Sequence, residues 1–429
     1  MLGKRIKSNS YIFLAMAIFS SFFCAFSAFA IDTVVLPENV RAFVFKHAEA
    51  SVPDSYGSTG VEKSFAVQET LTAALIKSVS PDVEDAYNKL YALDANLASN
   101  LNMGYVDLAP KINVKANAFA LAWGLTDRWM IATAIPVMSA DVSLSGGFYN
   151  TMSINQTVSA LQAYASDPSK AQAARNQALA LANALSAGVP QPKGEYLQGV
   201  IVNDYGYKPV GNWNASGIGD LQVFSVYKLI NNDNYKQAIK GGIDLPTGRI
   251  DDPDNLLDVP FGTGYFATYL ETLHDFVLVP GLLTFSSGAR YTYNWSTDRT
   301  FRLSPSSTFP LTSRKESLSY KPGNSITLAG EVSAKFFRSL GGYVNYTYKR
   351  KESDSIQGVD PSYNYTILST NTNSSAHSFA VGVSYSTVDL FLRKKFPVPF
   401  KLGISMSRVF RGINTERVNI TSADFEMYF

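Results

Sequence analysis

The chain has 429 residues, of which 46% are hydrophobic and 17% charged, and its formal net charge at pH 7 is +2. This balanced charge gives no indication of a nucleic-acid partner. The chain holds 24 Tyr and 27 Phe but only 3 His and 1 Cys, which excludes Cys-ligated metals, and no cofactor is expected.

Residues 1–30 are predicted to be a cleaved secretory signal peptide. Basic residues open it, an apolar stretch covers 11–26, and Ala28-Phe29-Ala30 is typical of a cleavage site. An uncleaved membrane anchor is the alternative, but the apolar stretch is short for one. Because Cys24 lies within this segment, the mature chain from Ile31 has no thiol for disulfide or nucleophilic chemistry.

Residues 31–429 are predicted to form one transmembrane β-barrel, an all-β fold, because apolar and polar residues alternate through much of the chain. In 326–336, for example, Ile326, Leu328 and Val332 share one face while Thr327, Glu331, Ser333 and Lys335 share the other. The segments 277–295, 377–386 and 401–407 show the same pattern. One such strand would suit a soluble sandwich, but a series of membrane-crossing length indicates a closed barrel of about twelve antiparallel strands, with fourteen as the alternative. The first strand is expected at 38–48 and the last at 417–429.

The links between strands alternate in length, as expected for short periplasmic turns and long external loops. Short links are expected at 126–127, 231–234, 274–275, 339–341 and 393–399, and long ones at 50–108, 142–214, 296–323 and 352–374. The first two long links are predicted to contain helical insertions at about 64–98 and 154–187. Ser80-Pro81 and Asp167-Pro168 are expected to open the main helices. Whether these insertions cover the barrel mouth or act in gating or ligand capture stays open.

Four acidic residues, Asp251, Asp252, Asp254 and Asp258, are expected in an external loop. They are weak candidates for a divalent-cation site, since hard cations take several oxygen ligands. A solvated turn rich in Asp and Asn is the commoner structure, and the spacing does not match the twelve-residue calcium loop. The metal prediction is therefore none.

The chain is not expected to be an enzyme. A barrel hydrolase needs a serine, a histidine and a polar orienting group on one surface. The only histidines are His47, His274 and His377, and none has a serine two residues later to share its strand face.

Alternation assigns a set of polar residues to the barrel lumen. Arg290, Glu331 and Lys335 are expected to point inward together, with Glu331 paired to Arg290 or Lys335, because a lone charge in a narrow lumen is costly. The full set of lumen-facing candidates is Lys240, Asp244, Glu271, Arg290, Glu331, Lys335, Asn345, Lys349, Lys401, Asp424 and Glu426.

The chain ends in a strand whose two faces differ. Phe425, Met427 and Phe429 share one face, and Asp424 and Glu426 share the other. This strand resembles the C-terminal signature that the barrel-assembly machinery of Gram-negative bacteria reads. It therefore predicts an outer-membrane location, with membrane lipid and that machinery as partners.

Two short motifs carry a family resemblance. Gly242-Ile243-Asp244-Leu245-Pro246-Thr247-Gly248 closes one alternating strand, and Pro260-Phe261-Gly262-Thr263-Gly264 opens the next. Together with Leu36-Pro37-Glu38-Asn39-Val40-Arg41, Tyr56-Gly57 and Gly60, they resemble the outer-membrane family named for the meta-pathway of phenol degradation, a relative of long-chain fatty-acid and aromatic-hydrocarbon transporters. Whatever the family, Pro246 is expected to end strand pairing and Gly248 to make a turn.

The resemblance implies porin-like transport, in which small hydrophobic or amphipathic molecules, aromatic ones among them, cross the outer membrane. Two alternatives stay open. One is a channel for polar solutes of the nucleoside or oligosaccharide type. The other is a surface barrel that binds a partner and transports nothing.

Overall fold

A computed structural model describes residues 31, 33–72, 81–149, 153–188, 198–305 and 311–429. The predicted signal peptide, 1–30, lies outside these described residues. The chain divides into two compact units, one made of the residues up to Phe65 with 111–143 and 212–429, the other of 66–110 and 144–211. Among the described residues, the helices are all too short or too polar to cross a membrane.

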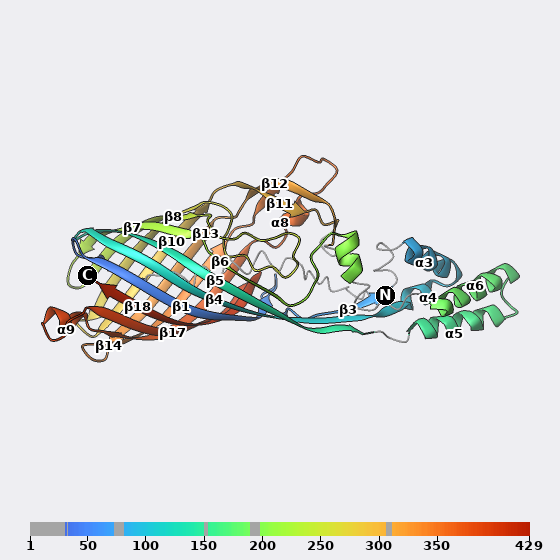
Figure 1. Ribbon diagram of the computed structural model, residues 1–429, viewed down its shortest axis with the longest axis horizontal. Helices are drawn as coiled ribbons and strands as arrows, with labels where there is room; N and C mark the ends of the chain where they lie inside the picture. The colour runs from blue at the N-terminus through green and yellow to red at the C-terminus, as the bar shows by residue number, and fades with distance from the viewer. Residues whose placement is uncertain (1–30, 32, 73–80, 150–152, 189–197, 306–310) are drawn as a thin grey trace. The chain divides into compact units, whose positions relative to one another are not determined.

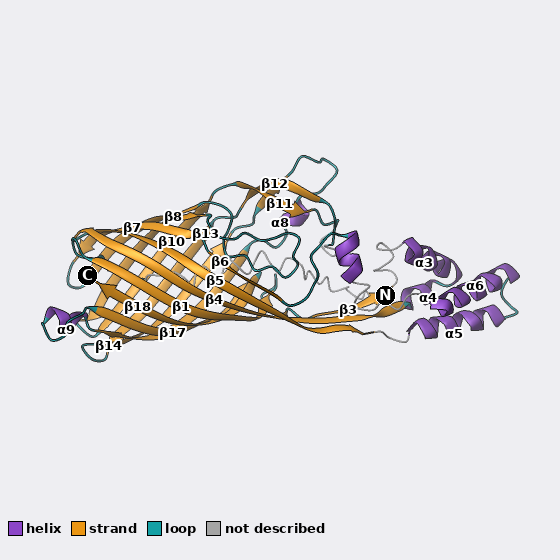
Figure 2. Cartoon of the chain, viewed as in Figure 1, coloured by secondary structure: helices purple, strands orange, loops and turns teal. Residues whose placement is uncertain are grey.

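The first unit is a closed antiparallel barrel of twelve strands, which confirms the predicted fold (Figures 1 and 2). Each strand pairs with its two neighbours, and β1 closes the ring between β18 and β4. In chain order the barrel strands are β1 (Arg41–Tyr56), β4 (Asn102–Thr126), β5 (Trp129–Tyr149), β7 (Leu221–Asn231), β8 (Tyr235–Leu245), β9 (Ala267–Val279), β10 (Leu283–Asn294), β13 (Ser325–Lys335), β14 (Leu340–Lys351), β16 (Ser374–Ser386), β17 (Phe400–Ile413) and β18 (Thr415–Tyr428). Short additional strands, β2 (Glu62–Ser64), β3 (Val67–Thr72) and β6 (Trp213–Ile218), pair with barrel strands at their ends.

An apolar belt covers the outer face of the barrel. Large side chains such as Leu328, Val332 and Ile404 are among the most exposed of their strands, whereas their alternate neighbours face inward. In a membrane, lipid covers such a belt, and all strand hydrogen bonds are satisfied within the closed ring. The alternating sequence thus folds as strands because each strand meets lipid on one side and the lumen on the other.

The short turns lie where the sequence predicts, with one exception. The sequence predicts a turn at His274-Asp275, but β9 continues to Val279 and the chain turns at Pro280-Gly281-Leu282. Gly281 takes a φ of +72°, which favours glycine, and the predicted strand 277–295 is therefore divided between β9 and β10. The β16–β17 link contains a short helix, α9 (Val388–Leu392).

Some predicted boundaries in the first two links were wrong. The first strand begins at Arg41 and continues to Tyr56. The predicted insertion at 64–98 starts later, because 67–72 is extended and pairs with β4, Val67 lying opposite Leu108. Asp167-Pro168 opens no helix, since the Asp167 carboxylate accepts a hydrogen bond from Ser169 N (2.9 Å) in the turn between two helices.

The second unit contains a helical cluster. Its helices are α3 (Pro81–Leu93), α4 (Ala95–Asn100), α5 (Ser153–Ser166), α6 (Gln172–Gly188) and the π-helical turn η1 (Val200–Asp204). Leu90, Leu161 and Ala182 are buried where α3, α5 and α6 meet, together with Ala98 of α4. Asp94 caps α4 by accepting hydrogen bonds from the backbone of Asn96 and Leu97.

A small folded cap, not predicted from the sequence, is built from two external loops of the first unit. It contains the sheet of β11 (Thr297–Arg302), β12 (Lys315–Lys321) and β15 (Ser355–Gln357), and the helical turn α8 (Thr366–Ser369). Its core buries Phe301, Leu318, Tyr320, Ile356 and Leu368. These links, predicted as plain loops, therefore have a hydrophobic core of their own.

Candidate functional site in the barrel lumen

The strand register decides which residues share the lumen. Glu331 of β13 lies opposite Ser286 of β10 and Asn345 of β14, on the face away from the apolar belt. By the same reading of the paired strands, the structure places every lumen candidate named from the sequence on this inner face. The inner face is chemically uneven, with an apolar wall on one side and a polar wall on the other.

The apolar wall, which we call the alanine wall, is formed by three neighbouring strands. The inner faces of 42–52 in β1, 112–122 in β4 and 130–142 in β5 carry small or apolar side chains, with Lys46 as the exception. Such side chains offer an aliphatic solute apolar surface without polar competition. Its buried members are Ala42, Val44, Ala48, Ala50, Val52, Ile112, Val114, Ala116, Ala118, Ala120, Ala122, Met130, Ala132, Ala134, Met138, Ala140 and Val142.

Three charged residues of the polar wall form one cluster. Glu271 lies directly opposite Lys240 on one side and Arg290 on the other. Its carboxylate is 3.7 Å from Lys240 Nζ and 2.7 Å from Arg290 Nη2. The two cations also lie over aromatic rings, Lys240 at 4.5 Å from the Phe224 centroid and Arg290 at 4.4 Å from that of Tyr269.

The predicted pairing of Arg290 or Lys335 with Glu331 was wrong for Arg290. Its ion pair is with Glu271, because that carboxylate is directly opposite while Glu331 is opposite Ser286. Glu331 instead accepts a hydrogen bond from Asn345 Nδ2 (3.4 Å). Asp244, two residues along β8 from the Gly242–Tyr269 pair, has a buried Oδ1 with no hydrogen-bond partner within the described part of the chain.

The remaining predicted lumen residues lie nearer the periplasmic turns or the external end. Lys401 Nζ is 3.3 Å from Glu426, which also accepts a hydrogen bond from Tyr428 (2.6 Å). Asp424 lies opposite Lys46 of β1, and Lys349 lies opposite Thr327 near the external end. The site therefore contains several small charge groups and no single continuous one.

The residues just before β1 lie inside the barrel, which sequence reasoning missed. Thr33 is 1% exposed, and its backbone N and Oγ1 donate to Asp275 Oδ2 at 3.1 and 2.6 Å. Ser286 donates to the other carboxylate oxygen at 2.7 Å. Val35 and Leu36 pack against Phe224, Leu273 and the alanine wall. The only available signal was the apolar run in 34–36, which suits an edge strand equally well.

The loop between β8 and β9, 246–266, also enters the lumen. Val259 and Phe261 are fully buried against the alanine wall. Arg249 lies over the rings of Trp213 and Phe261, at 5.2 and 5.6 Å from their centroids, and pairs with Asp258. The expectation of a solvated turn was therefore wrong for this loop.

Asp220 holds both ends of this loop. Its buried carboxylate accepts hydrogen bonds from Gly248 N (2.9 Å), Thr263 N (2.7 Å) and Thr263 Oγ1 (2.8 Å). Gly248 and Gly262 touch here, since a Cβ on either would lie 2.6 Å from the Cα of the other. The two motifs that carry the family resemblance thus meet at one carboxylate.

The four acidic residues of the loop face basic side chains or backbone N–H groups. Two arginines of β11 in the cap, Arg299 and Arg302, pair with loop residues. Arg299 is 3.2 Å from Asp251, and Arg302 is 2.6 Å from Asp254. The Asp252 backbone donates to Asp258. Within the described residues, no group of three or more acidic, His or Cys side chains has the arrangement to hold a metal ion. Burial raises the pKa of Asp251 to about 6, with Arg299 opposing the shift.

A cavity of about 540 Å³ lies at the end of the barrel that carries the short turns. Val34, Leu36, Val44 and Phe224 line one side of it. Lys335, Lys401 and Glu426 line the other. The cavity is thus amphipathic, and its apolar side continues along the alanine wall.

A closed barrel with an apolar belt, short turns at one end and long loops at the other is the architecture of an outer-membrane protein of Gram-negative bacteria. Residues 95–396 match the family described as "Putative MetA-pathway of phenol degradation", so the chain belongs to that family. No match was found among curated protein sequences.

Among solved structures, the chain is similar to an outer-membrane channel from Pseudomonas putida F1, with a TM-score of 0.52 and 12% identity over 93% of this chain and 98% of that one. The Pseudomonas putida toluene transporter TodX aligns with a TM-score of 0.34 and 11% identity, covering 99% of this chain and 98% of that chain. A FadL homologue of Pseudomonas aeruginosa aligns with a TM-score of 0.31 and 10% identity, covering 91% and 89%. At these identities the likeness concerns the fold alone.

Proposed function

We propose that this barrel passes small hydrophobic or amphipathic molecules, aromatic ones among them, across the outer membrane. The observation that carries the proposal is the alanine wall, an apolar strip from the cavity to the external half of the lumen. A hydrophobic solute following it exchanges water for methyl groups at each step. Membership in the phenol-degradation family supports the same class of solute.

A solute can pass along the alanine wall only if it displaces the apolar side chains that cover the wall. Val35 and Leu36 cover its periplasmic half, and Val259 and Phe261 cover its external half. Between them lies a short middle section formed by Val44, Ala120 and Ala134. We infer that a solute enters by taking the place of these apolar side chains, so that the wall is covered by apolar groups both before and after the solute arrives.

A polar-solute channel is the weaker alternative. In the cluster of Lys240, Glu271 and Arg290, the two cations share the Glu271 carboxylate and lie over aromatic rings. Cations already paired in this way offer a passing polar solute less than open charge rings do. Because the alanine wall and the family membership both support transport, we propose that the protein is a transporter rather than an enzyme.

The test is uptake of a nonpolar fluorescent probe, N-phenylnaphthylamine, by cells whose outer membrane excludes it. Ala120→Asp places a carboxylate in the middle of the alanine wall and is expected to lower the uptake rate at least tenfold. A carboxylate there replaces apolar surface with a charged group, which costs a hydrophobic solute more than the roughly 1.4 kcal/mol that a tenfold change represents.

The matched control is Ala329→Asp, the same change on the inner face of β13 in the polar wall. It is expected to leave uptake within about twofold of the original rate. Equal loss in both variants, or no loss in either, would contradict a path along the alanine wall. Large steady currents of small ions in planar bilayers would favour the polar-solute channel instead.

We also propose that the C-terminal strand is the signal read by the assembly machinery. Phe425 and Met427 lie opposite Phe45 and Phe43 of β1 in the seam that closes the ring. Phe429 exchanges two backbone hydrogen bonds with Arg41, at 2.7 and 2.9 Å. These interactions support a role for the strand in closure as well as in recognition.

A further inference from the structure

Three arginines stand together on the outer face of the barrel near its external end. Arg350 of β14 lies opposite Ser375 of β16, while Arg411 and Arg408 of β17 lie opposite His377 and Phe379 of β16. All three arginines are exposed. Neighbouring strands are about 4.8 Å apart and residues about 3.3 Å apart along a strand, so Arg411 lies roughly 12 Å from Arg350 and Arg408 roughly 16 Å from it across β16.

These arginines lie at the aromatic edge of the apolar belt, Arg350 just beyond it and Arg411 and Arg408 in register with Tyr348 and Tyr346. Along β14 the outward residues run Val344, Tyr346, Tyr348 and then Arg350, from the middle of the belt outward. Tyr346 hydrogen-bonds His377 (2.7 Å), and the ring of Phe410 lies 6.4 Å from that of Tyr346. Aromatic girdles mark the membrane–water interface, so the arginines lie at the level of the lipid headgroups.

No carboxylate within the described residues forms an ion pair with any of the three arginines. Other basic residues of this rim do have partners: Arg417 pairs with Asp54 and Glu62, and Lys115 pairs with Glu49 at 3.1 Å. Three neighbouring cations without a counter-charge repel one another, and an anionic partner removes that repulsion. We therefore expect these three arginines, the arginine patch, to attract an anionic group from outside the chain.

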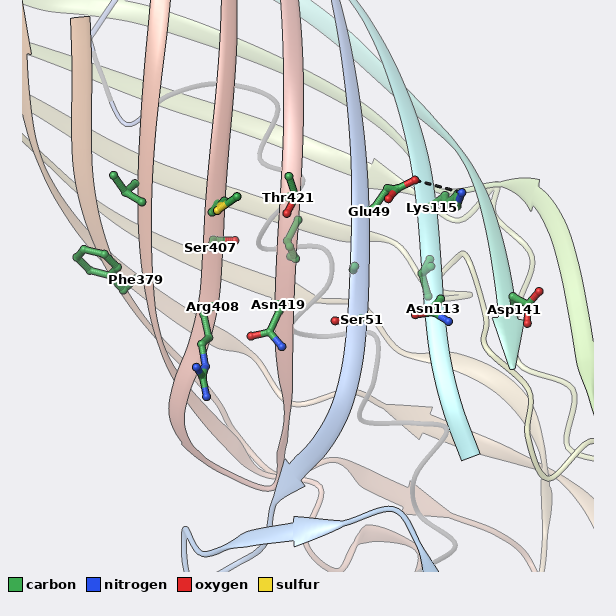
Figure 3. Close-up of a pocket in the computed structure, with 15 residues that line it drawn as sticks. Glu49, Ser51, Asn113, Lys115, Asp141, Phe379, Ser407, Arg408, Asn419 and Thr421 are labelled. Carbon is green, nitrogen blue, oxygen red and sulfur yellow. Dashed lines mark ion pairs between the residues drawn. The ribbon is translucent and has the colours of Figure 1, made fainter. Parts of the chain in front are cut away.

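Next to the patch the outer surface is hollowed. The hollow measures about 720 Å³ and extends across β16, β17, β18, β1 and β4 to Asp141 of β5 (Figure 3). Arg408 and Phe379 line one side, and the polar side chains of Ser51, Asn419 and Thr421 lie between them and the Glu49–Lys115 ion pair. Val381 and Met406 continue the lining toward the belt.

We propose that the arginine patch (Arg350, Arg408 and Arg411) and this outer hollow bind the phosphorylated headgroup of a glycolipid in the outer leaflet. Phosphate oxygens accept charge-assisted hydrogen bonds from guanidinium groups, often two at a time. Sugar hydroxyls suit the Ser, Thr and Asn side chains of the hollow, and the acyl chains would follow Val381 and Met406 along the belt. This site is separate from the lumen and does not depend on the proposed transport.

The experiment measures lipid binding to the purified full-length barrel by native mass spectrometry from detergent micelles containing bis-phosphorylated lipid A. The original protein is expected to keep the lipid. The triple variant Arg350→Gln, Arg408→Gln and Arg411→Gln is expected to bind it about a hundredfold more weakly, because each basic residue near an anionic lipid contributes roughly fivefold. The triple Arg→Lys variant should retain most of the binding, since a lysine also binds phosphate as a point charge.

The matched control removes three exposed cations at the other end of the barrel, by Arg128→Gln, Arg393→Gln and Lys395→Gln. It is expected to leave lipid A binding unchanged, and heat-modifiable gel mobility shows that each variant is a folded barrel. Equal binding by the patch variant and the control would overturn the proposal. So would phosphatidylglycerol binding as tightly as lipid A, or displacement by millimolar inorganic phosphate, since these would indicate a nonspecific anionic surface or a free-phosphate site.

Discussion

Replacing Asp220 should release the β8–β9 loop from the lumen. In Asp220→Ala, the buried N–H groups of Gly248 and Thr263 lose their acceptor, as does the Thr263 hydroxyl. Each unsatisfied buried donor costs about 1–3 kcal/mol, so we expect the docked loop to be destabilised by about 3 kcal/mol, roughly 150-fold in its open-to-docked ratio. Phe261 then leaves the alanine wall more often, and the lumen opens.

Single-channel recording in planar bilayers measures this effect as the frequency of opening. A graded series serves as the control: Thr263→Val removes only the hydroxyl and should raise the frequency about fivefold, and Asp220→Asn, which keeps one acceptor oxygen, should fall between. Limited proteolysis of 246–266 should follow the same order. Identical currents and protease resistance in Asp220→Ala and the original protein would refute the idea that this carboxylate holds the loop.

Three further predictions concern other interactions. Asp275→Ala removes the acceptor of both Thr33 hydrogen bonds and should make 33–37 accessible to proteases that spare the original protein; unchanged protection would contradict the assigned role. Because burial raises the pKa of Asp251 to about 6, the docked loop binds this proton more tightly than the released loop does, so docking should strengthen as the pH falls from 7 through 6 toward 4. Proteolysis of the loop should therefore be slower at pH 5 than at pH 7.5, and Asp251→Asn should remove that difference. Deleting Phe429 should reduce the heat-modifiable, folded fraction in outer membranes several-fold while Phe429→Tyr is tolerated, and equal folded fractions would argue against the C-terminal signal.

The wall of the barrel was predictable because its pattern is local. Alternation in segments such as 326–336 reflects one face toward lipid and one toward the lumen, and it needs no knowledge of which strands are neighbours. The same logic places Lys240, Glu271 and Arg290 on one face. Their mutual pairing was not predictable, because it depends on register across three strands, and register is set locally only at turns such as 280–282.

The contents of the barrel were not predictable for a different reason. Thr33 meets Asp275 across 242 positions of sequence, and Phe261 is buried by alanines far away in the chain. Neither interaction has a periodic signature in its own segment. The glycines and threonines of the two family motifs were visible, but their role required the position of Asp220, a residue that carried no motif of its own.

The position of Thr33 inside the ring has a consequence for how the barrel is made. The ring closes where β1 meets β18 along a ladder from Ala42 to Tyr56, and the segment preceding β1 is already enclosed in the finished structure. The segment is joined to the ring only at Arg41, at the rim, so it can enter the lumen through the open end and its docking is a step separate from closure. Refolding in vitro should therefore show two steps, with the heat-modifiable mobility of the closed ring appearing first and protection of 33–37 from proteases following it.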